Sequence, residues 1–153
     1  MKGSLEIMIA APADDVYDLV WDVTRMGEWS SVCHSCVWEP GSDSSAVGAR
    51  FVGHNRQGER EWSANCQVIS AEPGKEFAFA TLVPDSDEPL WRTVWRYTIT
   101  PEDDGTRLTE SFEVVNPPPA AGGMSEDAVA ARRADVLNNL RSTLDQIKRA
   151  AEK

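Results

Sequence analysis

The segment Leu90–Thr100 constrains the fold of this chain more than any other. Its side chains alternate: one parity holds Trp91, Thr93, Trp95, Tyr97 and Ile99, and the other holds Arg92, Val94, Arg96 and Thr98. Successive side chains of a strand point to opposite faces, so this pattern predicts a strand with one enclosed face. Leaving the rings in water would forfeit roughly 2 kcal/mol for each of them. The chain therefore needs another layer to cover one face of a sheet.

The same alternation predicts an enclosed face in three further segments. The inward side chains are Trp62, Ala64, Cys66 and Val68; then Phe77, Phe79 and Thr81; then Leu108, Glu110, Phe112 and Val114. Short stretches rich in Pro, Gly and Asp separate these segments, and strands joined by short connections pair in the antiparallel sense. With an opening strand at Leu5–Ile9 and strands near 33–38 and 48–55, we expect six to seven antiparallel strands in a curved sheet.

Apolar side chains at helical spacing predict helices before and after these strands. One short helix follows the opening strand, with Val16, Val20 and Val23 on one face, and 24–31 predicts a second short helix. A long helix is expected over about 125–152, and its apolar stripe consists of Val129, Val136, Leu137, Leu140, Leu144, Ile147 and Ala151. At 1.5 Å per residue this helix spans roughly 40 Å and can cross a whole sheet. The expected class is α+β, with a hydrophobic cavity between the long helix and the sheet.

Composition excludes several classes of partner. The 153 residues include 15 basic and 25 acidic side chains, a formal net charge of -10. Nucleic acids and anionic membrane surfaces are bound by basic fields, so we expect neither as a partner. No apolar run is long enough to span a bilayer. The length fits a single domain, 1–153, expected in the cytoplasm as a monomer or homodimer.

The sequence contains a Cys-x-x-Cys motif at Cys33 and Cys36. Because it runs into a strand, where residues three apart point to opposite faces, we expect the two sulfur atoms to diverge. That expectation disfavours redox chemistry, and Cys66 with two histidines at irregular spacing disfavours a zinc site. Both His34 and His54 are expected at the surface. We also find no phosphate-binding glycine loop or dinucleotide motif, so no metal and no cofactor is predicted.

Glu110 is the most informative single residue, because its parity places a carboxyl group on the enclosed face between Leu108 and Phe112. A buried carboxylate is costly unless paired, and its pKa rises. One interpretation is a polar anchor or acid/base group for a ligand. The other is a structural ion pair with Arg132 or Arg133 of the long helix.

Stretches in a characteristic order run through almost the whole chain: Ile9–Asp22, Met26–Ser30, Val47–Arg56, Trp62, Glu72–Phe79, Trp95–Tyr97 and Gly105–Ser111. Together they resemble the START-related SRPBCC superfamily, in particular its polyketide cyclase/dehydrase-like group, which shares its fold with the major birch pollen allergen. The resemblance implies a helix-grip fold with a hydrophobic cavity. It further implies a lipid, sterol, polyketide or similar ligand, with cyclase or aromatase activity in some members.

Two functions are therefore expected to compete. The first is binding or carrying a hydrophobic, aromatic or polycyclic small molecule. Its pocket would consist of Trp62, Phe77, Phe79, Trp91, Thr93, Trp95, Tyr97, Glu110, Phe112, Leu137, Leu140 and Leu144. The second is a polyketide cyclase or dehydratase in which Glu110 moves protons and Tyr97 polarises a carbonyl group. A third hypothesis is a protein-interaction surface on the outer sheet face, based on Arg92, Arg96 and Arg107.

Overall fold

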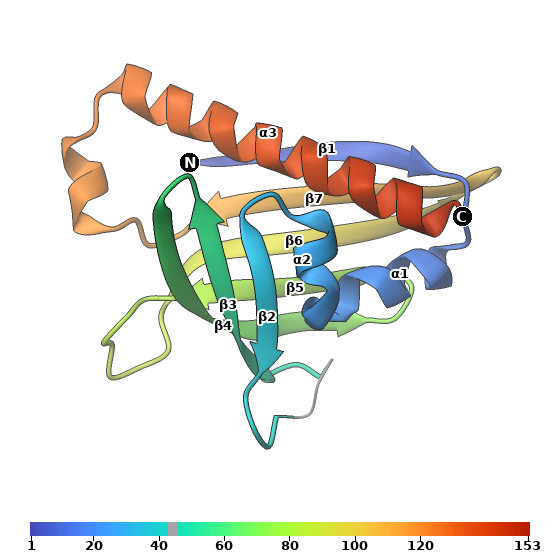
Figure 1. The fold of residues 1–153 in the computed structure, drawn as a ribbon, viewed down its shortest axis with the longest axis horizontal. Coiled ribbons are helices and arrows are strands. Elements are labelled where there is room, and N and C mark those ends of the chain that lie inside the picture. The colour runs from blue at the N-terminus through green and yellow to red at the C-terminus, as the bar shows by residue number, and fades with distance from the viewer. Residues whose placement is uncertain (43–45) are drawn as a thin grey trace.

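A computed structural model describes residues 1–42 and 46–153. Seven strands form one antiparallel sheet in the order β1-β7-β6-β5-β4-β3-β2. The strands are β1 (Lys2–Ile9), β2 (Cys33–Trp38), β3 (Arg50–Gln57), β4 (Arg60–Glu72), β5 (Glu76–Leu82), β6 (Trp91–Glu102) and β7 (Gly105–Val114). The helical segments are α1 (Ala13–Trp21), η1 (Val23–Arg25), α2 (Met26–Trp29), η2 (Pro119–Gly123) and α3 (Glu126–Ala151). Helices α1, α2 and α3 lie on one side of the sheet, and α3 runs along it (Figure 1), which confirms the predicted helix-grip fold.

The strand register confirms the predicted faces except at Trp91, which pairs with Leu82 beyond a register shift. Tyr97 of β6 lies between Phe77 of β5 and Glu110 of β7, so the three side chains share one face. Trp95 likewise lies between Phe79 and Phe112. This is the face that the helices cover. None of the helices among the described residues is both long and apolar enough to cross a membrane.

The core is tightest under the C-terminal half of α3. Leu140, Leu144 and Ile147 are at most 3% exposed against the sheet. Two polar contacts fasten the same end of the helix to the end of β1. The Lys148 Nζ donates to the Met8 carbonyl oxygen at 2.7 Å, and a Glu152 carboxylate oxygen accepts the Ala10 N–H at 2.8 Å. This half of α3 is therefore held by both packing and hydrogen bonds.

The N-terminal half of α3 has much less contact with the sheet. Ser125 caps the helix by accepting the Ala128 N–H, but Val129 is 36% exposed and Leu137 is only half-buried. Val129 belonged to the predicted apolar stripe, and its burial was predicted wrongly because the first turns of α3 extend beyond the packed core. Figure 1 shows this half of α3 and η2 framing the end of the sheet where β6 begins. The two halves of the helix thus have different environments.

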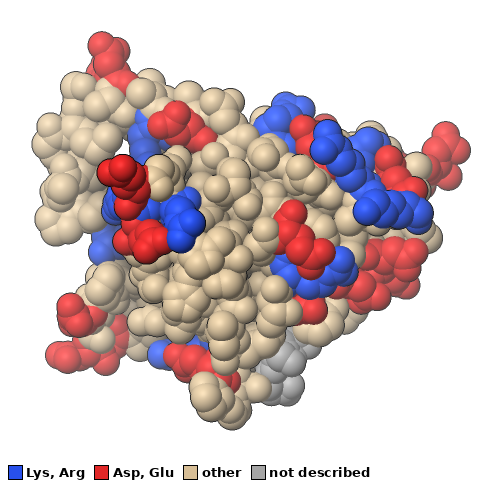
Figure 2. Space-filling view, in the orientation of Figure 1, with Lys and Arg blue, Asp and Glu red and all other residues tan. Residues whose placement is uncertain are grey.

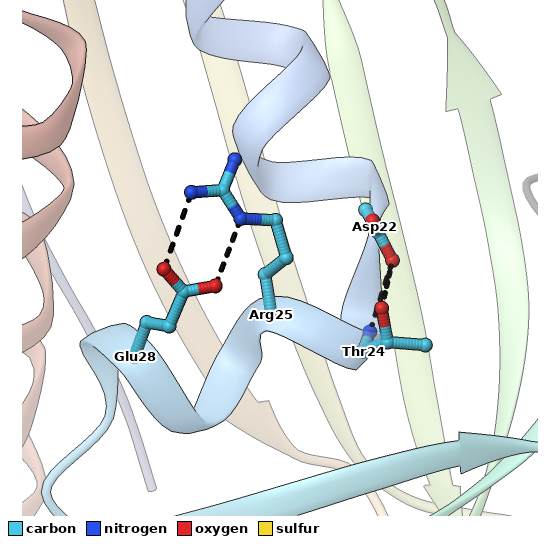
Figure 3. Close-up of polar contacts among 4 residues, drawn as sticks. All are labelled: Asp22, Thr24, Arg25 and Glu28. Atoms are coloured by element: carbon cyan, nitrogen blue, oxygen red, sulfur yellow. Dashed lines mark hydrogen bonds and ion pairs between the residues drawn. The ribbon is translucent and has the colours of Figure 1, made fainter.

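The short segment between α1 and β2 is fixed by local polar contacts (Figure 3). The Asp22 carboxylate accepts the Thr24 N–H at 3.1 Å at the start of η1. The Arg25 guanidinium donates to both carboxylate oxygens of Glu28, at 2.9 and 3.2 Å, and lies 4.9 Å from the Trp29 ring centre. These contacts hold the buried Trp29 indole beneath the two short helical turns.

Candidate functional site

A buried carboxyl group lies on the helix-covered face of the sheet. Glu110 is 5% exposed, and within the described residues its Oε2 atom has no hydrogen-bond partner. Burial raises the pKa of Glu110 to about 8, and interaction with the Tyr97 hydroxyl group opposes this rise only in part. At neutral pH the group is therefore mostly a neutral acid, which can donate a hydrogen bond as well as accept one.

Tyr97 is the cross-strand neighbour of Glu110 and is itself 4% exposed. Burial raises the pKa of Tyr97 well above its usual value, and the adjacent Glu110 carboxyl group raises it further. The hydroxyl group therefore stays protonated at physiological pH. Together the two residues place two weak acids side by side in an otherwise apolar interior.

The structural interpretation of Glu110 as an ion-pair partner is wrong in the part of the chain that the structure describes. The Arg133 guanidinium instead donates to the Lys2 carbonyl oxygen at 2.8 Å, and Arg132 is exposed. The carboxyl group of Glu110 is therefore buried with no cation beside it in the described residues, and its Oε2 atom is left unsatisfied.

Apart from Trp91, the remaining predicted pocket residues fall into two groups. Five are buried in the core: Phe77, Phe79, Phe112, Leu140 and Leu144. Four are only half-buried: Trp62, Thr93 and Trp95 on the covered face of the sheet, and Leu137 on α3. The enclosure of Trp91 was predicted wrongly, since its side chain is 41% exposed. It is the first residue of β6 and lies beyond a register shift at which β6 has one extra residue, so it pairs with Leu82 and loses the predicted parity.

The expected enclosed cavity coincides with neither of two hollows on the described part of the molecule. One hollow, of about 350 Å³, lies at the surface beside β1, β7 and α3, with Leu5 and Arg141 in its wall. A second, of about 370 Å³, lies beside Arg25, Trp29 and Arg149. Neither includes a predicted pocket residue. The deep end of the covered face is filled by side chains such as Phe51 and Phe79, whose ring centres are 5.2 Å apart in an edge-to-face arrangement.

The outer face of the sheet offers little free positive charge. Arg96 pairs with Glu76 at 2.9 Å, and Arg107 pairs with Glu102. In the view of Figure 2, Lys and Arg side chains instead gather over the C-terminal half of α3, beside acidic ones. The predicted basic stripe is thus largely neutralised, which weakens the interaction-surface hypothesis.

The largest departure from the sequence analysis concerns Cys33 and Cys36. Their sulfur atoms do not diverge but lie 3.3 Å apart. The strand argument failed because a bulge in β2 inserts one residue between the two cysteines, which no pattern in the sequence marks. Of the two histidines, His34 is exposed as expected, and His54 is half-buried with its Nδ1 2.9 Å from the Ser63 hydroxyl oxygen.

A comparison with known protein families shows which family this chain matches. The family described as "Polyketide cyclase / dehydrase and lipid transport" matches residues 2–152. The chain belongs to this family. Among curated proteins no significant match exists.

Several solved structures share the fold of this chain. A Polyketide_cyc-like protein from Corynebacterium glutamicum is 35% identical, over 97% of this chain and 90% of that protein, with a TM-score of 0.66. The di-domain aromatase/cyclase StfQ, from the steffimycin biosynthetic pathway, is 16% identical with a TM-score of 0.75 over 99% of this chain and half of that one. A protein from Nitrosomonas europaea is 14% identical, with a TM-score of 0.71 over 97% and 92% of the two chains. The two more distant structures support the polyketide cyclase-type fold and nothing finer.

Proposed function

We propose that this protein binds a hydrophobic small molecule, aromatic or polycyclic and bearing a keto or hydroxyl oxygen, between the N-terminal half of α3 and the sheet. The observation that carries the proposal is the buried Glu110 carboxyl group, whose Oε2 atom lacks a hydrogen-bond partner among the described residues. Such a group costs free energy in an empty fold and is satisfied by a ligand oxygen. Binding sites of this kind combine apolar walls with a few polar groups that orient the ligand.

The walls of the proposed site are the half-buried side chains on the covered face. Trp95 belongs to an inner strand of the sheet, yet part of its indole reaches solvent, and its ring centre is 5.9 Å from that of Phe112. An inner-strand indole reaches solvent only where the covering layer leaves it open. The ligand therefore lies over Trp95 and Thr93 and points its oxygen toward the Tyr97–Glu110 pair.

The entrance is the end of the sheet where β6 begins. Large apolar side chains that remain at least 36% exposed occur in the segments that meet there: Met1, Leu90, Trp91, Val115, Met124 and Val129. The Val114 N–H donates to the Met1 carbonyl oxygen and the Asn116 side-chain amide donates to the Trp91 carbonyl oxygen, so these segments are held together. An apolar rim favours entry of an apolar molecule.

The test is a binding titration with a polycyclic aromatic ketone, followed by tryptophan fluorescence, together with native mass spectrometry of the freshly purified protein. We expect Trp95→Ala to weaken binding about tenfold or more, because truncating a buried aromatic contact costs 1.4 kcal/mol or more. Val94→Ala is the matched control, since Val94 lies on the same strand and the opposite face. Equal affinity of the Trp95→Ala and Val94→Ala proteins would contradict the site.

Cyclase activity is a second candidate, favoured by the proximity of the Glu110 carboxyl group to the Tyr97 hydroxyl group. A carboxyl group with a pKa of about 8 is protonated at neutral pH and able to give a proton to an enolate or alkoxide oxygen. With a poly-keto substrate analogue, Glu110→Gln should abolish turnover if the protein is a cyclase. If the protein only binds its ligand, the same change should alter affinity alone.

A further inference from the structure

Cys33 and Cys36 form a close pair because of the bulge in β2. Cys33 lies opposite Asn55 and Cys36 lies opposite Gly53, so both side chains point to the same face of the sheet. Their Sγ atoms are 3.3 Å apart. Both sulfur atoms lie over Gly53: a Cβ atom at that position would be 3.7 Å from the Cys36 Sγ atom and 3.9 Å from the Cys33 Sγ atom, in ordinary van der Waals contact. A pair of thiols is thus assembled by the backbone.

The two thiols are enclosed between β2 and α2. Cys33 is 7% exposed and Cys36 is 5% exposed. The Cys33 thiol donates to the Ser35 carbonyl oxygen at 3.4 Å, and the Cys36 Sγ lies 3.9 Å from the Met26 sulfur atom. Both residues thus keep a small exposed fraction, and the intervening His34 is exposed.

The third cysteine, Cys66, makes a different contact. Cys66 is 3% exposed, and its thiol donates to the Ala64 carbonyl oxygen at 3.6 Å. Burial raises the pKa of Cys66 to about 12. The contact with Cys36, by contrast, lowers the pKa of Cys33, while the same contact raises the pKa of Cys36. Cys33 is therefore the first of the three thiols to ionise.

We propose that Cys33 and Cys36 are a redox modification site, at which a peroxide converts the two thiols into an intramolecular disulfide. The Cys33 thiolate attacks one peroxide oxygen, the O–O bond breaks, and the leaving hydroxide takes up the proton that Cys33 released. The Cys36 sulfur then attacks the Cys33 sulfenic acid, the S–O bond breaks, and the hydroxide leaves as water with the Cys36 proton. Two thiols and one hydrogen peroxide thus yield one disulfide and two waters.

The geometry favours a disulfide between Cys33 and Cys36 over one that involves Cys66. A disulfide bond is about 2.0 Å long, so the two sulfur atoms need to approach by little more than an ångström. Hydrogen peroxide is small enough to reach a thiol that is mostly, but not fully, buried. A thiolate is the reactive form of cysteine, so the thiol that ionises first attacks first.

Peptide mapping of the native protein after hydrogen peroxide treatment tests the proposal. Trypsin cleaves after Arg25, Arg50, Arg60 and Lys75, so Cys33 and Cys36 fall in peptide 26–50 and Cys66 in peptide 61–75. After alkylation under denaturing conditions without reductant, we expect peptide 26–50 unalkylated and lighter by two hydrogen atoms. Peptide 61–75 should be alkylated, and dithiothreitol should restore both thiols of peptide 26–50. Two alkylated cysteines in peptide 26–50 after peroxide treatment, or a cross-link between the two peptides, would overturn the proposal.

Alanine variants test the order of the steps, and circular dichroism checks that each variant folds. Cys36→Ala should stop at a Cys33 sulfenic acid that dimedone traps, and Cys33→Ala should react about tenfold more slowly than wild type. Cys66→Ala is the matched control and should form the disulfide at the wild-type rate. Loss of thiols at the wild-type rate in Cys33→Ala would overturn the assignment of the attacking thiol. The mapping of the wild-type protein decides the proposal even if a variant does not fold.

Discussion

The carboxyl group of Glu110 couples the stability of this protein to pH. Its pKa is about 8 in the folded protein, against a usual value of 4.5 in an exposed glutamate. Between these two values the folded protein holds one proton that the unfolded chain has lost, so folding stability falls as pH rises. The slope from this single group is about 1.4 kcal/mol per pH unit. Below pH 4.5 the effect vanishes, and above about pH 8 the loss is complete.

We therefore expect Glu110→Gln to remove this slope. Urea unfolding between pH 5 and 9 should show the wild-type protein losing free energy of unfolding relative to the variant, by a few kcal/mol in total. Glu113→Gln is the control, because Glu113 is an exposed residue of the same strand. If the free energy of unfolding changed with pH in the same way for the wild-type and Glu110→Gln proteins, Glu110 would be ionised in the folded protein.

The alternation of side chains along the strands predicted which polar groups lie together in the candidate site, but it did not predict which side chains there are exposed. The alternation in β6 and β7 placed Tyr97 and Glu110 on one face, and their register opposite one another agrees with it. Parity could not show that Glu110 has no ion-pair partner among the described residues, because that depends on where the long side chain of Arg133 points. It also could not show that Cys33 and Cys36 meet, because a bulge changes parity without changing the local pattern.

Among the elements, the junction between α2 and β2 depends on a glycine. A Cβ atom at Gly27 would lie 2.2 Å from the His34 carbonyl oxygen, which belongs to the backbone and cannot move aside cheaply. We expect Gly27→Ala to push α2 away from β2 and to lower the free energy of unfolding by about 2 kcal/mol. Thermal and urea unfolding measure this directly.

The matched control for this change is Gly122→Ala in η2, where a Cβ atom would meet nothing within 4 Å. We expect its effect on the free energy of unfolding to stay within about 0.5 kcal/mol. Gly27→Ala protein as stable as the control would mean that the contact between α2 and β2 relaxes easily.

Helix α3 is one element with two environments, and its dynamics should differ accordingly. The stretch 126–136 has few buried side chains, whereas 140–151 is packed on the sheet and fastened through Lys148 and Glu152. Local opening is easiest where buried contacts are fewest. Hydrogen exchange followed by mass spectrometry should therefore find faster exchange in 126–136 than in 140–151. Equal rates of hydrogen exchange along the whole helix would contradict this difference between the two halves of α3.

The element order was predictable because it depends on periodicity, which the sequence shows directly. The strand faces, the two short helices and the long C-terminal helix all follow from the spacing of apolar residues. How tightly α3 packs on the sheet along its length was not predictable in this way. It depends on how far core side chains such as Phe51 and Leu144 fill the covered face, and on where the helix leaves the sheet.

For the molecule as a whole, we call the end where α3 is packed on the sheet the closed end, and the end where its N-terminal half is mostly exposed the open end. The closed end holds the packed core, and the open end carries the exposed apolar rim and the half-buried Trp95. Under the proposed function, a ligand bound at the open end would contact both the N-terminal half of α3 and the sheet. Binding should thus order the part of the molecule that is least packed without it.

The last prediction follows from this arrangement. A saturating polycyclic aromatic ketone should slow hydrogen exchange in 119–123 and 126–136, because the bound molecule fills the space beneath them and suppresses local opening. Exchange in 140–151, already packed, should change little and serves as the internal control. The Trp95→Ala protein at the same ligand concentration should show a smaller effect in proportion to its weaker binding. Ligand-induced protection confined to the surface hollow beside Arg25 and Trp29 would place the binding site there instead of beneath α3.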